Sequence, residues 1–458
     1  MLLDLPRFYR AANPSRPLKV AQTEDRRYYI DFSSVRGGDI VSEIGRTIVR
    51  LSPDEPTTQL LTGHIGCGKS TELFRLKGGL EQQNFHVVYF ESDRDLEMAD
   101  VDISDILLMI AHQVTESMET VGIRLKPTYL EKLFQQLMEV LRSPMEVSDV
   151  SFSVGIAAIT ARAKESPEMR GQLRQYLEPR TKSIIDAINQ EILAAAITQL
   201  KEKGKRGLVV LADNLDRIDP IQRMDGRSQS EYLFVDRGEQ LKRLNCHVVY
   251  TIPLALIFSD ELPRLANRFG TAPKVLAMVP VTTRHGEFSA RGRSLLQKMV
   301  MVRAFPHLKE NERWQHIDQV FDTPDTLMRL VAISGGHMRN LMRLLYGCLQ
   351  KVDPPITYDV LEAVIRDERD ALMGLIDAQA WELLFEAISE TGEQGNEAYN
   401  PLLRSLFLYE YRDQDGRWFG LNPVLAETRA LTGSGRRITK FKSSGAQVVW
   451  RSKSCPKS

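Results

Sequence analysis

The sequence has little cysteine, no net charge and no long apolar run. Its four cysteines are scattered and form no Cys-x-x-Cys pair, which argues against a zinc site or a disulfide framework. Lysine plus arginine equals aspartate plus glutamate, so the molecule as a whole is not an electrostatic nucleic-acid binder. No stretch approaches the roughly 20 apolar residues of a membrane-spanning helix, and the N-terminus does not resemble a signal peptide. We expect a cytoplasmic protein without membrane contact.

The basic residues are unevenly distributed along the chain. Residues 428–458 contain eight lysines and arginines and no aspartate or glutamate. Because the net charge of the whole sequence is zero, residues 1–427 carry a net charge of −8. A basic tail of this kind is either a solvated segment or an arm that binds DNA or an acidic partner.

Residues 57–71 contain the pattern G-x-x-x-x-G-K-[ST], which runs from Gly63 to Ser70 between an apolar run and a helical pattern. Phosphates need several backbone N–H groups that point into one cavity, and glycines let the backbone curl that tightly. The helix that follows adds its positive N-terminal end. The stretch therefore predicts a loop that binds the phosphates of a nucleotide.

Several side chains of this loop have an expected role. Lys69 is expected to contact the β- and γ-phosphates, and the Ser70 hydroxyl to bind Mg²⁺. Because no N-K-x-D motif for guanine occurs, we expect ATP rather than GTP, with Mg²⁺ as the second cofactor. The predicted phosphate-binding residues are Gly63, His64, Ile65, Gly66, Cys67, Gly68, Lys69, Ser70 and Thr71.

A second motif is the apolar run 208–212, which ends in Asp213. A continuously apolar strand is buried on both faces, as in a parallel sheet covered by helices. Ligands bind at the carboxyl edge of such sheets. We therefore expect Asp213 to hold Mg²⁺ through water, opposite Ser70.

The residue after Asp213 bears on hydrolysis. Many nucleotide hydrolases have glutamate or aspartate there, whereas this chain has Asn214, which orients a water but cannot accept its proton. Asp216 is the nearest carboxylate, unless it pairs with Arg217. Two interpretations follow: slow hydrolysis that uses Asn214 or Asp216, or nucleotide binding with negligible turnover.

Three further buried strands are predicted, at residues 85–91, 246–253 and 275–279. With the strands that precede Gly63 and end at Asp213, they indicate a five-stranded parallel α/β sheet. Thr251, near the end of the fourth strand, is placed to contact the γ-phosphate or the attacking water. The residues between the second and third strands are mostly helical, apart from a short extended piece at 150–156, and we interpret them as a partner-facing insertion.

The region after the sheet is predicted to form a helical lid. The glycines in Ser334-Gly335-Gly336 end one helix, and Arg339 lies in the first turn of the next. Its guanidinium either reaches a γ-phosphate or remains exposed to solvent. Two later helices and a hairpin around Asp415-Gly416 predict a winged-helix-like module that binds DNA or, because the hairpin is acidic to neutral, a protein.

The expected organisation has five parts. They are an N-terminal lead-in (1–55), a P-loop NTPase core (56–285) with a helical insertion (about 100–206), a helical lid (286–372), a winged-helix-like domain (373–427) and a basic tail (428–458).

The chain resembles a bacterial AAA+/STAND-type P-loop ATPase over roughly residues 35–425. The resemblance depends on three stretches: 63–71, 209–217 and 334–345. The run Asp213-Asn214-Leu215-Asp216-Arg217 is similar to the D-D-L-D-R signature of KAP-type NTPases, with asparagine at the second position. The membrane insertions of the KAP group are missing, so we do not assign the chain to that group.

The resemblance implies further roles for three residues. Thr251 would be sensor 1, Arg339 would be sensor 2, and Arg268, in an Arg-Phe pair, would be an arginine finger that acts on a neighbouring subunit. Arg264 competes with Arg268 for the last role. A trans-acting arginine implies a homo-oligomer.

These observations favour an ATP-binding ATPase that acts as a nucleotide-driven regulatory switch with slow hydrolysis. Mg-ATP would bind between core and lid, and a homo-oligomer or protein partner would complete the assembly. One alternative is a DNA-binding AAA+ loader or transposition-type ATPase that uses the winged helix and basic tail. Another is a non-hydrolysing nucleotide-binding scaffold.

Overall fold

The computed structural model describes residues 3–140, 155, 163–224, 226–389 and 397–428. The chain divides into two compact units, each built from separate stretches of sequence. The sheet unit comprises residues 40–62 and 72–275, and the loop unit comprises residues 1–39, 63–71 and 276–458. The predicted phosphate loop therefore belongs to the unit that also contains the N-terminus and the C-terminal half of the chain.

The sheet unit contains the predicted five-stranded parallel sheet, with the strand order β2-β3-β4-β1-β5. Its strands are rich in valine and leucine, and β1, β3 and β4 are buried along their whole length, as expected for a sheet covered on both faces. The strands are β1 Thr58–Thr62, β2 His86–Glu91, β3 Leu208–Asp213, β4 His247–Thr251 and β5 Lys274–Val275.

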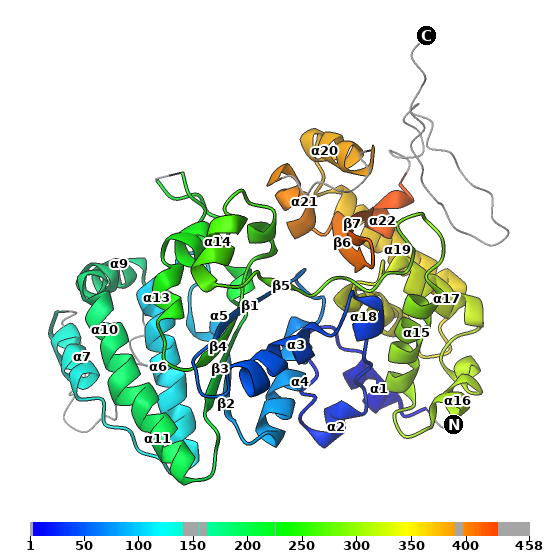
Figure 1. Ribbon diagram of the computed structural model, residues 1–458. Coiled ribbons are helices and arrows are strands. Elements are labelled where there is room, and N and C mark those ends of the chain that lie inside the picture. The colour runs from blue at the N-terminus through cyan, green and yellow to red at the C-terminus, as the bar shows by residue number, and fades with distance from the viewer. Residues whose placement is uncertain (1–2, 141–154, 156–162, 225, 390–396, 429–458) are drawn as a thin grey trace. The chain divides into compact units, whose positions relative to one another are not determined.

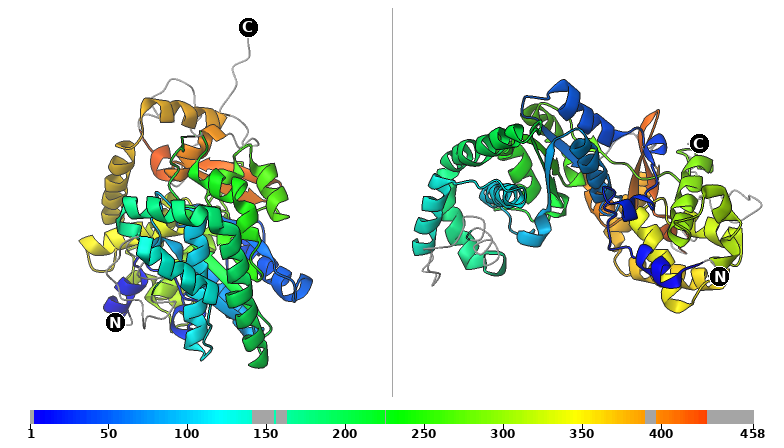
Figure 2. Two further views of the ribbon diagram at one scale, coloured as in Figure 1. Left: turned by 90° about the vertical axis from the view of Figure 1, so that its left-hand side faces the viewer. Right: turned by 90° about the horizontal axis from the view of Figure 1, so that it is seen from below.

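Helices cover both faces of this sheet (Figures 1 and 2). On one face, Phe74 of α4 packs against Tyr89 of β2, with ring centroids 4.2 Å apart. On the other face, the long helix α6 contacts β2 and β3, and α11 contacts β3. These covering helices are α3 Ile40–Arg46, α4 Lys69–Gln82, α6 Ile103–Thr120 and α11 Ala195–Glu202.

The helical insertion predicted between the second and third strands is present. Helix α6 begins at a capping box in which the backbone N–H of Asp102 donates to Asp105, 2.8 Å away. The extended piece predicted at residues 150–156 lies outside the described residues, apart from residue 155. Beyond α6 and α11, the helices here are α7 Thr128–Val140, α9 Pro167–Leu177, α10 Thr181–Ala187 and a π-helical turn Ile188–Ala194.

The predicted fifth strand is wrong in its extent. Only Lys274 and Val275 pair with β1, whereas the expectation covered residues 275–279. The backbone N–H of Met278 instead donates to the carbonyl oxygen of Glu410, 3.0 Å away. The short helices of the sheet unit are α5 Ser92–Asp95, α12 Gln229–Glu231, α13 Gly238–Lys242 and α14 Leu262–Phe269.

The loop unit is mostly helical, and the hairpin predicted around Asp415 is present. The hairpin consists of β6 and β7, which pair in antiparallel register from Leu408↔Leu421 to Asp413↔Gly416. The elements are α1 Leu5–Ala11, α2 Thr23–Arg26, α15 Ala290–Ala304, α16 Glu310–Trp314, α17 Pro324–Ile333, α18 Met338–Lys351, α19 Tyr358–Met373, α20 Ala378–Ser389, α21 Asn400–Arg404, β6 Leu408–Asp413, β7 Gly416–Leu421 and α22 Pro423–Ala426.

An ion-pair cluster connects the helices of this unit. Arg329 of α17 lies 2.6 Å from Glu362 of α19 and 2.6 Å from Glu427, the residue after α22. Arg369 of α19 lies 3.0 Å from the same Glu427. Because these side chains are mostly buried, the cluster fixes α22 against the two helices more firmly than exposed pairs would.

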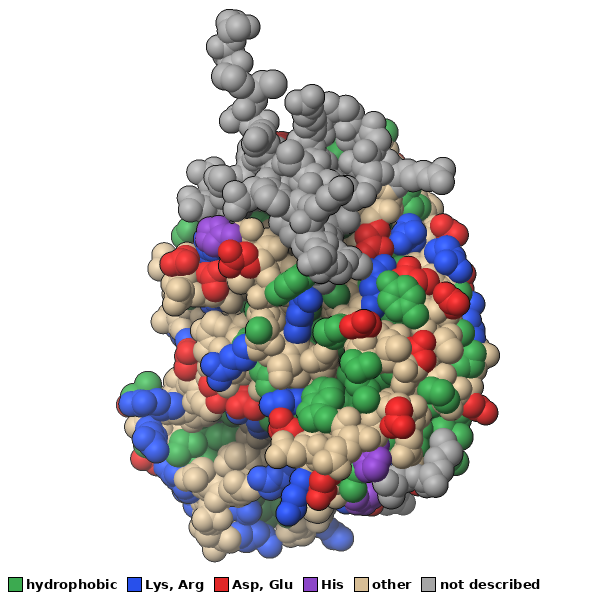
Figure 3. All heavy atoms as spheres, turned by 90° about the vertical axis from the view of Figure 1, so that its right-hand side faces the viewer, with side chains coloured by type: hydrophobic (Ala, Val, Ile, Leu, Met, Phe, Trp, Pro, Cys, Tyr) green, Lys and Arg blue, Asp and Glu red, His purple; other side chains and the backbone are tan. Residues whose placement is uncertain are grey.

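Within the described residues, no helix combines the length and the apolar character that crossing a bilayer requires. Acidic and basic side chains are mixed over most of the described part of the face in Figure 3. The basic tail predicted at 428–458 lies outside the described residues, except for Thr428.

Candidate nucleotide-binding site

The phosphate loop has the backbone that its glycines predict. Gly63, Gly66 and Gly68 have φ values of 151°, 90° and 103°, a region that residues with a Cβ rarely adopt. A Cβ on Gly66 would also lie 2.9 Å from the side chains of His337 and Arg339. The loop therefore depends on glycine both for its curl and for the close approach of α18, and this curled backbone fits a phosphate cradle.

Lys69 begins helix α4, and its ammonium group folds back over the loop. Its Nζ donates to the carbonyl oxygens of Gly63 and His64, at 2.7 and 2.9 Å. The side chain is buried. The positive charge is thus held at the curl itself, where a phosphate chain would meet it.

The start of α18 contacts the tip of the loop. His337 Nε2 donates to the carbonyl oxygen of Ile65, 2.8 Å away, while its Nδ1 accepts the backbone N–H of Asn340 and so caps the helix. The backbone N–H of Arg339 donates to the carbonyl oxygen of Gly66 at 3.2 Å. The predicted sensor arginine is therefore placed against the loop through its backbone.

Strand β6 of the C-terminal hairpin also contacts the phosphate loop. The backbone N–H of Glu410 donates to His64 Nε2, 2.8 Å away. The ring of Tyr409 stacks on His337 and meets His64 edge-on, with centroids 5.9 and 6.0 Å apart. The two imidazoles and the phenol form one buried ring cluster beside the loop.

The N-terminal segment supplies a further contact. Arg36, just before the Gly37-Gly38 pair, is 2% exposed and donates from its guanidinium to the carbonyl oxygen of Cys67, 2.5 Å away. Burial of a guanidinium is costly unless its donors are bonded. This contact therefore holds the lead-in segment against the phosphate loop.

Burial sets the charge state of the groups around the loop. It lowers the pKa of His64 to about 3 and that of His337 to about 4, and the neighbouring cations act in the same direction. Burial also raises the pKa of the Glu410 carboxyl to about 7. At neutral pH both imidazoles are therefore neutral, as their acceptor roles require.

The second predicted motif lies at the carboxyl edge of β3, within the sheet unit. Asp213 is fully buried, and its carboxylate accepts the Tyr89 hydroxyl and the Asn214 N–H, each at 2.8 Å. Asn214 has a left-handed backbone, φ 66°, which turns the chain sharply after the strand. These contacts orient a carboxylate that is a suitable metal ligand.

Asp93 was not predicted as a site residue. It lies in α5, directly after β2, and one of its oxygens accepts the side-chain amide of Asn214 at 2.7 Å. Its other oxygen lies 2.5 Å from Arg217. The pairing of Arg217 with Asp216 that the sequence left open is therefore replaced by a pairing of Arg217 with Asp93. The sequence feature that could have identified Asp93 is its position just after a predicted strand, because ligands bind at the carboxyl edge of a parallel sheet.

The structure brings Thr251 to this edge. Its buried hydroxyl accepts the backbone N–H of Leu215 at 3.1 Å and faces the carbonyl oxygen of Ala212 at 3.5 Å. Asp216 lies in the same turn and is 8% exposed. Asp213, Asn214, Asp216 and Thr251 are thus gathered at one edge of the sheet.

The two arginine-finger candidates differ in their surroundings. Both lie on α14, but Arg264 pairs with Glu261 at 2.7 Å and with Asp236 at 3.6 Å. Arg268 makes no ion pair with any residue that the structure describes, and it is half-buried. An arginine that is not already paired is the better candidate for a contact with another subunit.

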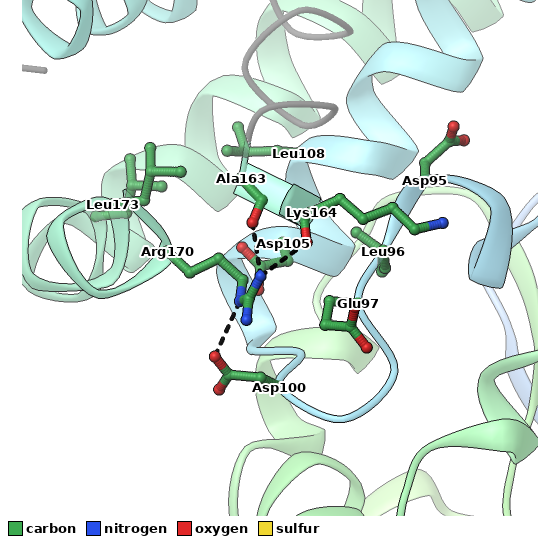
Figure 4. A pocket seen from close by; sticks show the side chains of 11 residues that line it. Asp95, Leu96, Glu97, Asp100, Asp105, Leu108, Ala163, Lys164, Arg170 and Leu173 are labelled. Atoms are coloured by element: carbon green, nitrogen blue, oxygen red, sulfur yellow. Dashed lines mark hydrogen bonds and ion pairs between the residues drawn. The ribbon is translucent and has the colours of Figure 1, made fainter. Parts of the chain in front are cut away.

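A small pocket in the insertion is structural. Arg170 of α9 donates to Asp100 at 2.9 Å and to the carbonyl oxygens of Ala163 and Lys164 at 2.8 and 2.9 Å (Figure 4). The pocket has a volume of about 30 Å³. That is room for only one or two waters, and the bonds of Arg170 fasten α9 at this point.

The five-stranded parallel sheet, together with the glycine-curled loop that follows β1, defines a P-loop nucleotide-binding fold. Among solved structures, the chain is similar to Cdc6p from Pyrobaculum aerophilum, with 11% identity over 89% of this chain and 97% of that chain and a TM-score of 0.38. It is also similar to the Walker-type ATPase paby2304 of Pyrococcus abyssi, with 12% identity over 91% and 98% and a TM-score of 0.39. The Aeropyrum pernix ORC2 protein matches with 12% identity over 86% and 91% and a TM-score of 0.36.

With TM-scores below 0.5, these similarities carry no argument about what this protein binds or does. No family model and no curated protein matches the sequence.

Proposed function

We propose that this protein is an ATP-binding P-loop ATPase that acts as a nucleotide-driven regulatory switch. The observation that carries the proposal is that four consecutive loop residues, 64–67, each hydrogen-bond to a segment outside the loop. Those segments are the N-terminal lead-in, α18 and β6. A loop held from so many elements passes any change in its shape directly to them.

Each loop residue has a proposed role. Residues 63–71 bind the phosphates through their backbone N–H groups, Lys69 contacts the β- and γ-phosphates, and Ser70 Oγ contributes to the Mg²⁺ site. Asp213 supplies the second oxygen ligand, directly or through water. Arg339, whose backbone already contacts Gly66, senses the γ-phosphate through its guanidinium.

Slow hydrolysis follows from the residues at the sheet edge. Asn214 orients the attacking water but cannot take its proton, and its amide is held by Asp93. We propose that Asp93 positions Asn214. Differential contacts of the loop to ATP and ADP then set which arrangement of the lid and hairpin is populated.

The test is nucleotide binding and phosphate release by the wild type, Lys69→Ala and Lys201→Ala. Lys201 is exposed on α11 and outside both motifs, so it serves as the matched control. We expect magnesium-dependent ATP binding and slow phosphate release by the wild type and the control. In Lys69→Ala we expect ATP affinity at the phosphate loop to fall at least a hundredfold. ATP binding that is equal in all three proteins would refute the proposal. Tight binding without turnover would leave only the scaffold interpretation.

The DNA-loader alternative has its own readout in the same assay. A loader would hydrolyse ATP faster when duplex DNA is added, and the effect would fall steeply with salt because phosphate contacts release counterions. We expect no stimulation, because Leu408 to Tyr411 of β6 are buried and the backbone N–H of Glu410 bonds to His64 of the phosphate loop. Stimulation that salt abolishes would favour the loader over the switch.

A further inference from the structure

A polar cavity of about 450 Å³ opens in the loop unit at the N-terminal helices. Helix α1 lies beside α15 there, and α2 and the segment after α15 complete the walls (Figure 1). The volume is within the range of pockets that hold small molecules. The basic and aromatic side chains that line the cavity are Arg7, Arg10, Arg16, Arg27, Tyr28 and His307.

Two of the three carboxylates in the walls are already engaged. Asp25 is 3% exposed and accepts the Arg16 guanidinium at 3.0 Å and the backbone N–H of Lys19 at 2.9 Å. Asp4 caps α1 by accepting the backbone N–H of Arg7 at 3.1 Å. Only Glu24 remains as an acid in the walls without a bond to a described residue.

Three of the four arginine side chains have no carboxylate partner among the described residues. Arg7 contacts neutral groups, because its Nε donates to the Tyr28 hydroxyl at 2.9 Å and its NH1 donates to His307 Nε2. The guanidiniums of Arg10 and Arg27 make no hydrogen bond or ion pair with any residue that the structure describes. Three guanidiniums around one small space repel each other unless an anion lies between them.

A buried cation adds to this field. Arg303 of α15 is 7% exposed and donates to the carbonyl oxygens of Ala11 and Met299, at 3.1 and 2.7 Å. Burial lowers its pKa to about 10, so the group remains charged at neutral pH. Ala11 itself lines the cavity, which places this fourth uncompensated cation directly behind the wall.

We propose that this cavity binds a small polyphosphate group, either free or carried by a nucleoside, at a site separate from the phosphate loop. Several guanidiniums around one cavity suit a polyphosphate better than they suit a ligand with a single carboxylate. Each guanidinium can bind two oxygens of a different phosphate. The cavity volume of about 450 Å³ is also large enough for a ligand of nucleotide size. The N-terminal segment that forms the cavity continues to Arg36, whose guanidinium bonds to the phosphate loop. A ligand in the cavity can therefore affect the loop through this segment.

The test uses full-length protein with Lys69→Ala, in which the phosphate loop is disabled. Inorganic tripolyphosphate is titrated by calorimetry, first at low salt and then at 150 mM salt. We expect one ligand per chain, and at least tenfold weaker binding when Arg10→Gln and Arg27→Gln are added together. Both side chains are at least partly exposed, so the double variant is expected to fold, and circular dichroism checks this.

Arg26→Gln is the matched control, because Arg26 is an exposed arginine of α2 outside the cavity. Binding unchanged in this control supports the site, whereas an equal loss in Arg26→Gln would overturn it as general surface attraction. Absence of tripolyphosphate binding would overturn it as well.

ATP is the second probe, also measured in the Lys69→Ala protein. Tighter binding of ATP than of tripolyphosphate identifies a nucleotide as the ligand, and equal binding identifies a free polyphosphate. Failure of the proposed function would be seen separately, because wild type and Lys69→Ala would then bind the same number of ATP molecules per chain with the same magnesium dependence.

Discussion

The Nε2 atom of His64 accepts a hydrogen bond from the backbone N–H of Glu410, 2.8 Å away, although 346 positions separate the two residues in the sequence. His64 belongs to the phosphate loop and Glu410 to the C-terminal hairpin. The imidazole is 2% exposed, so the contact is shielded from water and persists only while the two elements stay together. The C-terminal hairpin is therefore part of the immediate surroundings of the proposed phosphate loop.

Removing His337 is expected to loosen the phosphate loop. His337→Ala loses the bond to Ile65 and the cap of α18, changes that cost about 1 kcal/mol each. We expect faster hydrogen exchange in residues 63–71 and several-fold weaker Mg-ATP binding. His285→Ala, which changes an exposed histidine of the same unit, is the control. Unaltered exchange in His337→Ala would mean that α18 does not hold the loop.

Acid is expected to destabilise the ring cluster. The pKa values of His64 and His337 are lowered to about 3 and about 4, while unfolded imidazoles titrate near 6.5. The neutral imidazoles therefore stabilise the fold fully above about pH 6.5, and this stabilisation is lost as the pH falls toward 4 and then 3. Glu410 acts in the opposite sense, because its raised pKa, about 7, stabilises the fold at low pH and less so as the pH rises through 7.

The measurement is the thermal unfolding midpoint between pH 5 and pH 7, for the wild type and His337→Gln. Glutamine keeps a donor and an acceptor but does not titrate, so the variant should lose less stability on acidification. Glu410 is present in both proteins and cancels in the comparison. The same acid dependence in both proteins would rule out His337 as a source of it.

Changing Asp93 is expected to slow hydrolysis without weakening ATP binding. Asp93→Asn keeps the shape but weakens the bonds to the Asn214 amide and the Arg217 guanidinium. We expect kcat to fall about tenfold or more while KM changes little, because the lost interaction acts on the orientation of the water. Asp95→Asn, two residues further along α5, should behave like the wild type. A rise in KM with kcat unchanged would contradict a positioning role.

The arginine-finger hypothesis predicts complementation between subunits. Lys69→Ala disables the phosphate loop of its own chain, whereas Arg268→Ala would disable the site of a neighbour. We expect each variant alone to be inactive and an equimolar mixture to recover part of the activity. Arg264→Ala, which loses only its local pairs with Glu261 and Asp236, should retain activity. No recovery in the mixture would exclude a contribution of Arg268 across subunits.

The sheet and the phosphate loop were predictable because their signals are local. Gly63 to Ser70 and the apolar run that ends at Asp213 occupy short windows in which residue types and spacing encode backbone shape and burial. The hairpin at Asp415 and the helix break at Gly335 were found for the same reason. Each of these features depends on a few consecutive residues.

The contacts of the site with distant segments were not predictable in this way. Nothing near His64 in the sequence indicates that its ring meets Glu410, and nothing near Asp93 indicates a bond to Asn214. The extent of the fifth strand also differs from the prediction: its pairing ends at Val275, and the backbone N–H of Met278 bonds to Glu410. Partners of this kind are fixed by topology, which single-sequence patterns do not specify.

The most direct test of the central claim is hydrogen exchange of residues 408–413 with and without Mg-ATP, in the wild type and Lys69→Ala. If the loop reads the nucleotide and passes its state to the hairpin, protection of β6 will change on addition of ATP in the wild type and stay constant in Lys69→Ala. An identical response of β6 in both proteins, or none in the wild type although ATP is bound, would contradict the account.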